Sequence, residues 1–240
     1  MKPTLFISDL HLCLSRPHIN RIFFTFMQSI APRAQALYAL GDLFEYWAGD
    51  DDLGDAFNTQ VITAFRELTQ QGVPLYIMHG NRDFLMGGEL VRACGAKLLP
   101  DPSLIDLYGT PTLLMHGDTL CTDDTAYQTF RAQVRTPVWQ KDFLAQPLAA
   151  RKAVIEKARA QSELDKSQKS ETIMDVNPGT VEIVLREHGY PRLIHGHTHR
   201  PARHQHMVDG KNCERWVLSD WYRHGEVLRC DESGCGVIKL

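Results

Sequence analysis

Five short apolar runs, each followed directly by a polar block, constrain the fold of this chain more than any other feature. The runs cover residues 5–7, 36–40, 75–78, 113–115 and 193–194. They are too short for helices and have the residue types of buried strands. In open α/β sheets, side chains that follow the carboxyl ends of the strands meet in one crevice. The pattern therefore predicts an α/β fold with a functional site at the ends of these strands.

The polar blocks contain seven side chains that can bind a metal ion. They are Asp9, His11, Asp42, Asn81, His116, His197 and His199. A mixture of carboxylate, imidazole and amide ligands suits Mn²⁺, Zn²⁺ or Fe²⁺ better than Ca²⁺ or a thiolate-bound structural zinc. Seven ligands are too many for one tetrahedral ion, whereas two ions that share a carboxylate accommodate them. We expect two metal ions, with Asp42 as the shared ligand.

Each block also has an ordinary structural interpretation. Asp-x-His and Gly-Asp are common in turns and at helix starts, and a lone histidine is usually structural. Five such blocks at five strand ends favour the metal site over this interpretation. For the additional pair His204 and His206, we expect the solvated face of a strand, with a third metal site as the alternative.

Composition narrows the class of protein. The chain has 240 residues, of which 43% are hydrophobic, so it can bury a full core. Its net charge of −3 provides no overall attraction for nucleic acid. We therefore expect no nucleic-acid partner, and nothing in the sequence indicates an obligate protein partner.

Six cysteines are spread along the chain without a Cys-x-x-Cys pair. They are Cys13, Cys94, Cys121, Cys213, Cys230 and Cys235. Because a domain of this size does not need disulfide bonds, we expect free thiols in a reducing compartment. The N-terminal residues lack the apolar segment of a signal peptide, and no run of about 18 apolar residues could span a membrane. These observations predict a cytoplasmic protein that at most lies against a membrane.

The apolar periodicity predicts the layers of the fold. Residues 19–30 and 57–68 have helical spacing and lie between the first three predicted strands. This order is typical of a β-α-β-α-β unit with right-handed crossovers. After Gly189, short strands separated by turn signals predict a β-meander. Two sheets with helices outside account for both halves, so we expect a four-layer α-β-β-α sandwich.

Residues 123–171 have helical patterns without strand signals, so we expect an inserted helical cap on a core of residues 1–122 and 172–240. Residues 131–171 hold nine Lys or Arg and five Asp or Glu, although the whole chain is acidic. A phosphate-rich ligand or an anionic membrane surface would explain this excess, and a solvated helix with paired charges is the alternative. The insertion begins shortly after His116 and mixes bulky apolar with cationic residues. This mixture favours a substrate with an apolar part and a phosphate part.

In their order, the polar blocks resemble the motifs of the calcineurin-like metallophosphoesterases. The motifs are Asp-x-His at 9–11, Gly-Asp at 41–42, Gly-Asn-x-Asp at 80–83, His116, and Gly-His-Thr-His at 196–199. The resemblance implies the four-layer fold and two metal sites. It assigns one metal to Asp9, His11, Asp42 and His199, and the other to Asp42, Asn81, His116 and His197.

Arg82 departs from the usual family pattern, because many members have a histidine there that protonates the leaving group or stabilises the phosphate. An arginine can clamp a phosphoryl oxygen but does not donate a proton. Such a site suits a leaving group that needs little protonation, such as a phosphate. We therefore expect hydrolysis of a pyrophosphate bond.

Three longer motifs resemble one branch of this family, which hydrolyses UDP-2,3-diacylglucosamine in lipid A biosynthesis. They are Gly-Asn-Arg-Asp-Phe at 80–84, Met-His-Gly-Asp-Thr-Leu-Cys-Thr-Asp-Asp-x-x-Tyr at 115–127, and Ile-Met-Asp-Val-Asn at 173–177. The resemblance implies a lipid-linked UDP-sugar as the substrate, and UMP and 2,3-diacylglucosamine 1-phosphate (lipid X) as the products. It also implies two Mn²⁺ ions as cofactors and peripheral contact with the cytoplasmic face of a Gram-negative inner membrane.

The resemblance further implies roles for individual residues. Substrate contacts fall on Asn81, Arg82, Asp124, Ser162, Lys166, Lys169 and His197, and Lys166 stands where some relatives have asparagine. For catalysis we expect Asp42 to hold the metals, while Arg82 and His197 stabilise charge as a dimetal-activated water attacks the diphosphate. We also expect Asp83 to orient neighbouring groups. Some of Trp139, Phe143 and the neighbouring apolar residues are expected to line a pocket for the acyl chains, with a cap packed closed on itself as the alternative.

Two other functions fit parts of the pattern. One is a phosphodiesterase or nucleotide pyrophosphatase that acts on a soluble substrate, for which the cap would need no apolar pocket. The other is a binding scaffold that has lost catalysis. The presence of all seven metal-binding side chains disfavours the scaffold.

Overall fold

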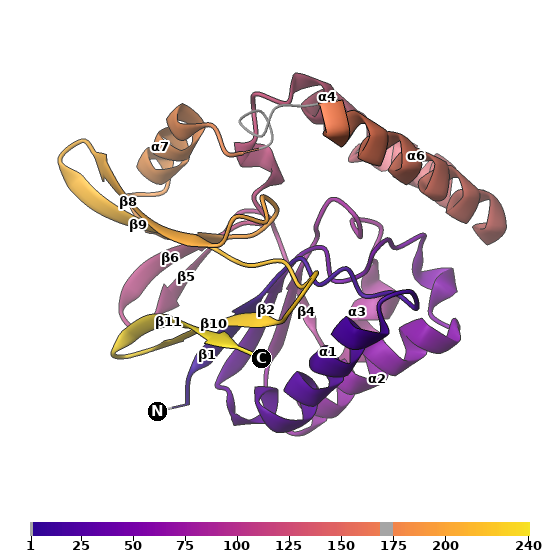
Figure 1. The fold of residues 1–240 in the computed structure, drawn as a ribbon, viewed down its shortest axis with the longest axis horizontal. Helices are drawn as coiled ribbons and strands as arrows, with labels where there is room; N and C mark the ends of the chain where they lie inside the picture. The colour runs from indigo at the N-terminus through magenta and orange to yellow at the C-terminus, as the bar shows by residue number, and fades with distance from the viewer. Residues whose placement is uncertain (1, 169–174) are drawn as a thin grey trace.

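Two β-sheets lie face to face, with helices on their outer faces, in the computed structural model of the chain (Figure 1). The structure describes residues 2–168 and 175–240. Three clusters of buried apolar side chains separate the four layers. The expected α-β-β-α sandwich is confirmed.

The first sheet has six strands in the order β11-β10-β1-β2-β3-β4. These strands are β1 (Thr4–Ile7), β2 (Ala36–Leu40), β3 (Leu75–Met78), β4 (Lys97–Leu99), β10 (Glu226–Asp231) and β11 (Gly234–Lys239). The strands β1, β2 and β3 are parallel as predicted, β4 extends them, and β10 is antiparallel to β1. The outer face carries α1 (Pro17–Ser29), α2 (Ala56–Gln70) and α3 (Gly88–Cys94).

The second sheet has five strands in the order β5-β6-β7-β9-β8. They are β5 (Ser103–Leu107), β6 (Thr110–Leu114), β7 (Arg192–His195), β8 (Ala202–Val208) and β9 (Lys211–Val217). On its outer face lies α7 (Pro178–Glu187), which begins where the Asn177 side chain accepts a hydrogen bond from the amide of Thr180. Three short 3₁₀ helices, η1 (Ala31–Arg33), η2 (Asp50–Asp52) and η3 (Asp118–Leu120), lie in the connections.

Alternation of side chains along the strands explains why the sheets are covered on both faces. In β1, Leu5 and Ile7 belong to the cluster beneath the outer helices, whereas Phe6 belongs to the cluster between the sheets. In β7, Leu193 packs toward α7 and Ile194 packs between the sheets. Successive side chains point to opposite faces of a strand, so a continuous apolar run buries both faces at once.

The prediction of a β-meander after Gly189 is wrong. The strands β7, β8 and β9 belong to the second sheet, whereas β10 and β11 belong to the first, and β7 pairs with β9 in parallel. Turn signals locate the ends of strands but do not determine their partners, which depend on the apolar surface that each strand can cover. The prediction also lacked α3, α7, β4 and β5.

The predicted cap region forms three helices, α4 (Thr125–Val134), α5 (Pro137–Leu144) and α6 (Leu148–Gln168). The Asp124 side chain accepts a hydrogen bond from the amide of Tyr127 at the start of α4, and Thr136 caps α5 in the same way. Figure 1 shows α4 and α6 grouped at one end of the molecule. The helical character expected of this segment is therefore present.

Several basic side chains of α6 pair with carboxylates of the core, which supports the alternative of paired charges for these residues. Arg151 is buried and contacts Asp51, and the Lys152 ammonium lies 2.7 Å from an oxygen of Asp52. Arg159, two turns further along α6, contacts Glu45. These long-range pairs anchor α6 to the segment that follows β2.

The expectation of six free thiols is also wrong for two of them. Cys230 and Cys235 form a disulfide, whereas Cys13, Cys94, Cys121 and Cys213 are free. The two bonded residues are direct partners across the β10–β11 hairpin, and their Cα atoms are 4.1 Å apart. Hairpin register brings their side chains together, and cysteine spacing alone does not reveal this register.

No helix in the described part of the chain is long and apolar enough to cross a membrane.

The packing of α1 on α2 leads to a test of the core. Phe23 is fully buried and meets the ring of Phe65 edge to face, with centroids 5.3 Å apart. We expect Phe23→Ala to lower the free energy of unfolding by about 3–5 kcal/mol, because it removes buried surface and leaves a cavity. Phe130 on α4 is 50% exposed, and Phe130→Ala should cost less than about 0.5 kcal/mol. Urea unfolding measures both values, and equal losses would contradict this description of the core.

Candidate metal centre

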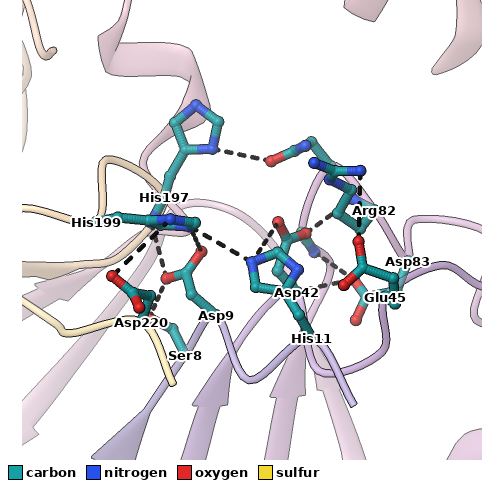
Figure 2. Close-up of polar contacts among 12 residues, drawn as sticks. Ser8, Asp9, His11, Asp42, Glu45, Arg82, Asp83, His197, His199 and Asp220 are labelled. Carbon is teal, nitrogen blue, oxygen red and sulfur yellow. Dashed lines mark hydrogen bonds and ion pairs between the residues drawn. The ribbon is translucent and has the colours of Figure 1, made fainter. Parts of the chain in front are cut away.

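Loops after five strands bring the seven predicted metal ligands to one end of the two sheets. Asp9 and His11 follow β1, Asp42 follows β2, and Asn81 follows β3; His116 follows β6, and His197 and His199 follow β7. Figure 2 shows Asp9, His11, Asp42 and His199, which come from three different loops, pointing toward one another. Both sheets contribute ligands, because the strands that precede these loops end on the same side of the molecule.

The backbone at these ligands is unusual. Asp9, His11, Asp42, His197 and His199 all have positive φ values, between 50° and 69°. Residues other than glycine rarely adopt φ values in this range. Those that do cluster at functional sites, where the surrounding structure holds the backbone in this conformation. Among residues 2–168 and 175–240, eight non-glycine residues have positive φ, and five of them are predicted metal ligands.

Two glycines in the motifs allow the loops to approach closely. A side chain at Gly80 would overlap the carboxylate and amide of Asp42, and a side chain at Gly196 would overlap Ser8 and Asp9. The glycine before Asn81 and the glycine before His197 are thus required by the packing of neighbouring loops.

The first group of ligands consists of Asp9, His11 and His199. The Nε2 atom of His199 lies 3.3 Å from Oδ1 of Asp9 and 3.4 Å from Nε2 of His11. The other oxygen of Asp9 accepts hydrogen bonds from the Ser8 hydroxyl and from the amide of His197. One carboxylate oxygen therefore stays directed at the two imidazoles.

The second group contains Asp42 and His116, with Asp9 nearby. Nε2 of His116 lies 3.8 Å from Oδ1 of Asp42 and 3.0 Å from Oδ1 of Asn81. The same amide oxygen lies 2.8 Å from Nδ1 of His197. Asn81, His116 and His197 thus meet around one point.

Asp42 lies between the two groups. Its Oδ2 atom is 3.9 Å from Nε2 of His11, and its Oδ1 atom is 3.8 Å from Nε2 of His116. A carboxylate whose two oxygens face different histidines has the geometry required of a bridging ligand. Nε2 of His11 and Nε2 of His116 thus face different oxygens of one carboxylate, and this set of carboxylate and imidazole ligands fits a pair of divalent cations.

A second set of contacts holds these ligands in place. Nδ1 of His116 donates to the carbonyl of Leu40 over 2.8 Å, which leaves Nε2 free to face the centre. Asp83, fully buried, accepts hydrogen bonds from the amides of Gly80 (2.8 Å), Leu43 (2.7 Å) and Asp42 (3.3 Å). The expectation that Asp83 orients its neighbours agrees with these contacts.

Burial and neighbouring charges set the protonation of the site. Burial tends to raise the pKa of Asp9, but His199, His116 and His11 outweigh it and hold the pKa below its usual range. Burial lowers the pKa of His11, and burial together with His116 lowers that of His197 to about 3. Asp9 is therefore charged, and His11 and His197 are neutral, as metal ligands must be.

The remaining residues predicted to contact substrate lie in different settings. Arg82 follows Asn81, and its amide donates to Oδ1 of Asp42 over 2.8 Å. Asp124 caps α4. Ser162 and Lys166 belong to α6, but their side chains are outside the described structure, as is the whole of Lys169.

Sequence reasoning missed three groups beside the metal centre. Glu45, buried in the loop after β2, contacts Arg16, Arg82 and Arg159. Tyr222 stacks on His11, with centroids 5.2 Å apart and an interplanar angle of 4°. Asp220 lies 4.0 Å from Nδ1 of His199. Glu45 ends the Gly-Asp-Leu-Phe-Glu block, but its partners come from distant segments that no local pattern indicates.

His204 and His206 are partly buried on β8. Nε2 of His206 accepts a hydrogen bond from Arg215 over 3.0 Å. A guanidinium at this distance disfavours a bound cation, so the interpretation as a strand face is retained over a third metal site.

Comparison with known protein sequences identifies a family profile and close relatives that the chain matches. The profile of the family described as calcineurin-like phosphoesterase matches residues 2–201. The chain is 57% identical to the UDP-2,3-diacylglucosamine hydrolase of Aromatoleum aromaticum, over 96% of this chain and 94% of that protein. It is 52% identical to proteins of the same name from Xanthomonas axonopodis pv. citri and Stenotrophomonas maltophilia, over 99% of this chain and 98% of each relative.

The electrostatics of Asp42 and His116 predict that metal affinity depends on pH. Burial, with Asp83 and Asp9, raises the pKa of Asp42 to about 7 against the opposing effect of His116. Burial would lower the pKa of His116, but Asp42, Asp9 and Asp118 raise it to about 9. Below these values the pair holds protons that a cation must displace, so affinity for Mn²⁺ should rise between about pH 6 and pH 9. Calorimetric titration in buffers of different ionisation enthalpy measures affinity and proton release together. Equal affinity at pH 6.5 and 8.5 without proton release would contradict this account.

Proposed function

The chain belongs to the calcineurin-like phosphoesterases, and we propose that it is a metal-dependent hydrolase of UDP-2,3-diacylglucosamine. The products are UMP and 2,3-diacylglucosamine 1-phosphate, an intermediate of lipid A biosynthesis. The proposal is carried by one observation, the convergence of seven side chains able to bind a metal ion in a chain 52–57% identical to proteins of that name over nearly its whole length.

The proposal includes two Mn²⁺ ions as the cofactors. Asp9, His11, Asp42 and His199 would hold one ion, and Asp42, Asn81, His116 and His197 the other. Bound ions of this kind lower the pKa of water and neutralise phosphate charge. The opposed directions of the two Asp42 oxygens support a shared ligand.

Arg82 and His197 are the residues proposed to act on the phosphate. Arg82 offers a planar fork of N–H donors beside Asn81, which suits a phosphoryl oxygen. Burial and His116 lower the pKa of His197 to about 3, so its imidazole is neutral at pH 7 and its one remaining N–H is a very weak acid. Neither side chain is an acid that could protonate an alkoxide. A phosphate leaving group needs no such acid, which supports cleavage of a pyrophosphate bond.

We further propose that residues 123–171 act as a cap over the acyl chains, on a core of residues 1–122 and 172–240. Phe130, Val138, Leu144 and Val154 are large apolar side chains exposed on α4, α5 and α6. Trp139 stacks on Phe143, with centroids 4.7 Å apart, but Phe143 is buried in the core cluster. The exposed group supports an apolar contact better than Phe143 does.

Substrate contacts at Asp124, Ser162, Lys166 and Lys169 stay part of the proposal by resemblance. Peripheral contact with the inner membrane is also proposed, because a substrate with two acyl chains resides in a bilayer. A nucleotide pyrophosphatase for soluble substrates is the second candidate, supported by the pairing of α6 cations with core carboxylates.

The central prediction is metal-dependent release of UMP from the acylated substrate. Purified protein is stripped with a chelator, reloaded with Mn²⁺ or Mg²⁺, and assayed on UDP-2,3-diacylglucosamine beside UDP-N-acetylglucosamine. We expect turnover of the acylated substrate with Mn²⁺ and none without metal, because the metal-ligating side chains cannot activate water in the absence of a bound ion. Equal turnover of the chain-free control would assign the protein to the second candidate function.

Removal of the shared ligand should abolish catalysis. We expect Asp42→Ala to reduce kcat by at least about a thousandfold, since both ions lose a ligand. Asp142→Ala, which alters an exposed carboxylate on α5, should leave kcat unchanged. Circular dichroism and thermal unfolding check that both variants fold. A folded Asp42→Ala protein with near-normal turnover would refute the assignment.

A further inference from the structure

A buried arginine of the second sheet, Arg215 on β9, contacts two histidines. Arg215 is only 6% exposed, and His195 at the end of β7 is fully buried. Nη1 of Arg215 lies 3.1 Å from Nε2 of His195, and its Nε donates to Nε2 of His206 on β8 over 3.0 Å. Burial of a guanidinium group is costly unless its N–H groups are hydrogen-bonded, so these two contacts keep Arg215 in a fixed position.

The contacts of His195 determine which of its ring nitrogens carries the proton. A guanidinium group can only donate hydrogen bonds, so Nε2 of His195 must accept from Arg215. Nδ1 of His195 lies 2.9 Å from the carbonyl oxygen of Gly196, which can only accept, so Nδ1 must donate. Both contacts therefore require the neutral ring with its proton on Nδ1.

The peptide group between Gly196 and His197 continues this chain of hydrogen bonds. Its carbonyl accepts from His195 and also from the amide of Thr198, over 2.9 Å. Its N–H, which belongs to His197, donates to Oδ2 of Asp9 over 2.9 Å. Figure 2 shows Asp9 beside His197. The chain of hydrogen bonds thus ends at a predicted metal ligand.

Close packing leaves little room for the ring of His195 to move. A side chain at Gly117 would lie 2.8 Å from Nδ1 of His195. The amide of Gly196 donates to the carbonyl of His116 over 2.8 Å. The ring of His195 is therefore held between two loops that carry predicted metal ligands, the loop after β6 and the loop after β7.

Two other arginines of the same sheet make different contacts. Nε of Arg192 on β7 lies 2.7 Å from an oxygen of Glu214, and Nε of Arg203 on β8 lies 2.5 Å from the other oxygen. These ion pairs lie within the sheet and involve no residue of the loops that carry the predicted ligands. Arg192 is therefore a suitable control for a role of Arg215 at the metal centre.

We propose that Arg215 is a positioning residue of the metal centre, which acts through His195 to orient the peptide group between Gly196 and His197 and so holds Asp9 toward the metals. This inference rests on the proposed function, because it deepens the account of the same metal centre. The hydrogen bonds all point from Arg215 toward Asp9, and bonds in such a chain strengthen one another. Arg215 and His195 act without touching the metal or the substrate.

The first test is the affinity of the purified protein for Mn²⁺, measured by calorimetric titration. Arg215→Met should weaken binding about tenfold, because partners that orient metal ligands typically contribute about tenfold to a hundredfold to the affinity. Arg215→Lys keeps a cationic donor and should recover part of the loss. Arg192→Met should leave the affinity unchanged. Thermal unfolding of the metal-free variants shows whether each of them folds.

Nuclear magnetic resonance of the metal-free protein gives a readout that does not depend on activity. Nitrogen–proton correlation spectra of the wild-type protein should show His195 with its proton on Nδ1. The amide proton of His197 should shift upfield in Arg215→Met, because its hydrogen bond to Asp9 weakens, and should not shift in Arg192→Met. If Arg215→Met does not fold, Arg215→Lys takes its place and should show a smaller shift in the same direction.

Three results would overturn the inference. They are a wild-type His195 with its proton on Nε2, an unshifted His197 amide in the folded Arg215 variant, and an affinity for Mn²⁺ equal to that of the wild type. If the variant loses affinity but the wild-type protein does not cleave UDP-2,3-diacylglucosamine, the proposed function fails and the role of Arg215 stands. If the wild type cleaves this substrate and the variant binds Mn²⁺ equally well, the proposed function stands and the role of Arg215 fails.

Discussion

The reciprocal hydrogen bonding between the loops after β2 and β3 is the constraint on which the rest of the site depends. Asp42 in the first loop accepts from the amide of Arg82 in the second, while Asp83 in the second accepts from the amide of Leu43 in the first. The close approach requires Gly80, where any side chain would overlap Asp42. These contacts between the two loops place Asp42 between His11 and His116, and they place Arg82 beside Glu45.

This arrangement of the two loops costs free energy by itself, and the packed layers beneath the loops offset that cost. Residues with positive φ cost about 1–3 kcal/mol each, and burial of Asp9, Asp42 and Asp83 in one region adds repulsion. The apolar clusters under the helices and between the sheets offset these costs, because their strands end directly at the loops. Two bound cations would remove most of the repulsion, so the same arrangement that strains the metal-free protein prepares it for metal.

The side chains that meet at the candidate metal centre could be predicted from the sequence because each is local to a strand end. An apolar run followed by Asp9 or Asp42 determines both the position of the strand and the place of the side chain, before any tertiary pairing is known. Two features depend on strand pairing and register, namely the partners of β10 and β11 and the Cys230–Cys235 bond. The contacts of Glu45 depend on distant residues, such as Arg159, which lies more than 100 positions away in the sequence. The count of charges in the cap could not show which cations are paired, because the carboxylates that pair with Arg151 and Lys152 lie in the core.

The proposed metal centre has loops from both sheets holding two ions through one carboxylate. Electron paramagnetic resonance of protein reconstituted with Mn²⁺ tests this arrangement directly, because two Mn²⁺ ions bridged at about 3.5–4 Å are magnetically coupled. We expect two equivalents of Mn²⁺ per chain with a spin-coupled signal. One equivalent, or two ions with uncoupled signals, would contradict a shared carboxylate.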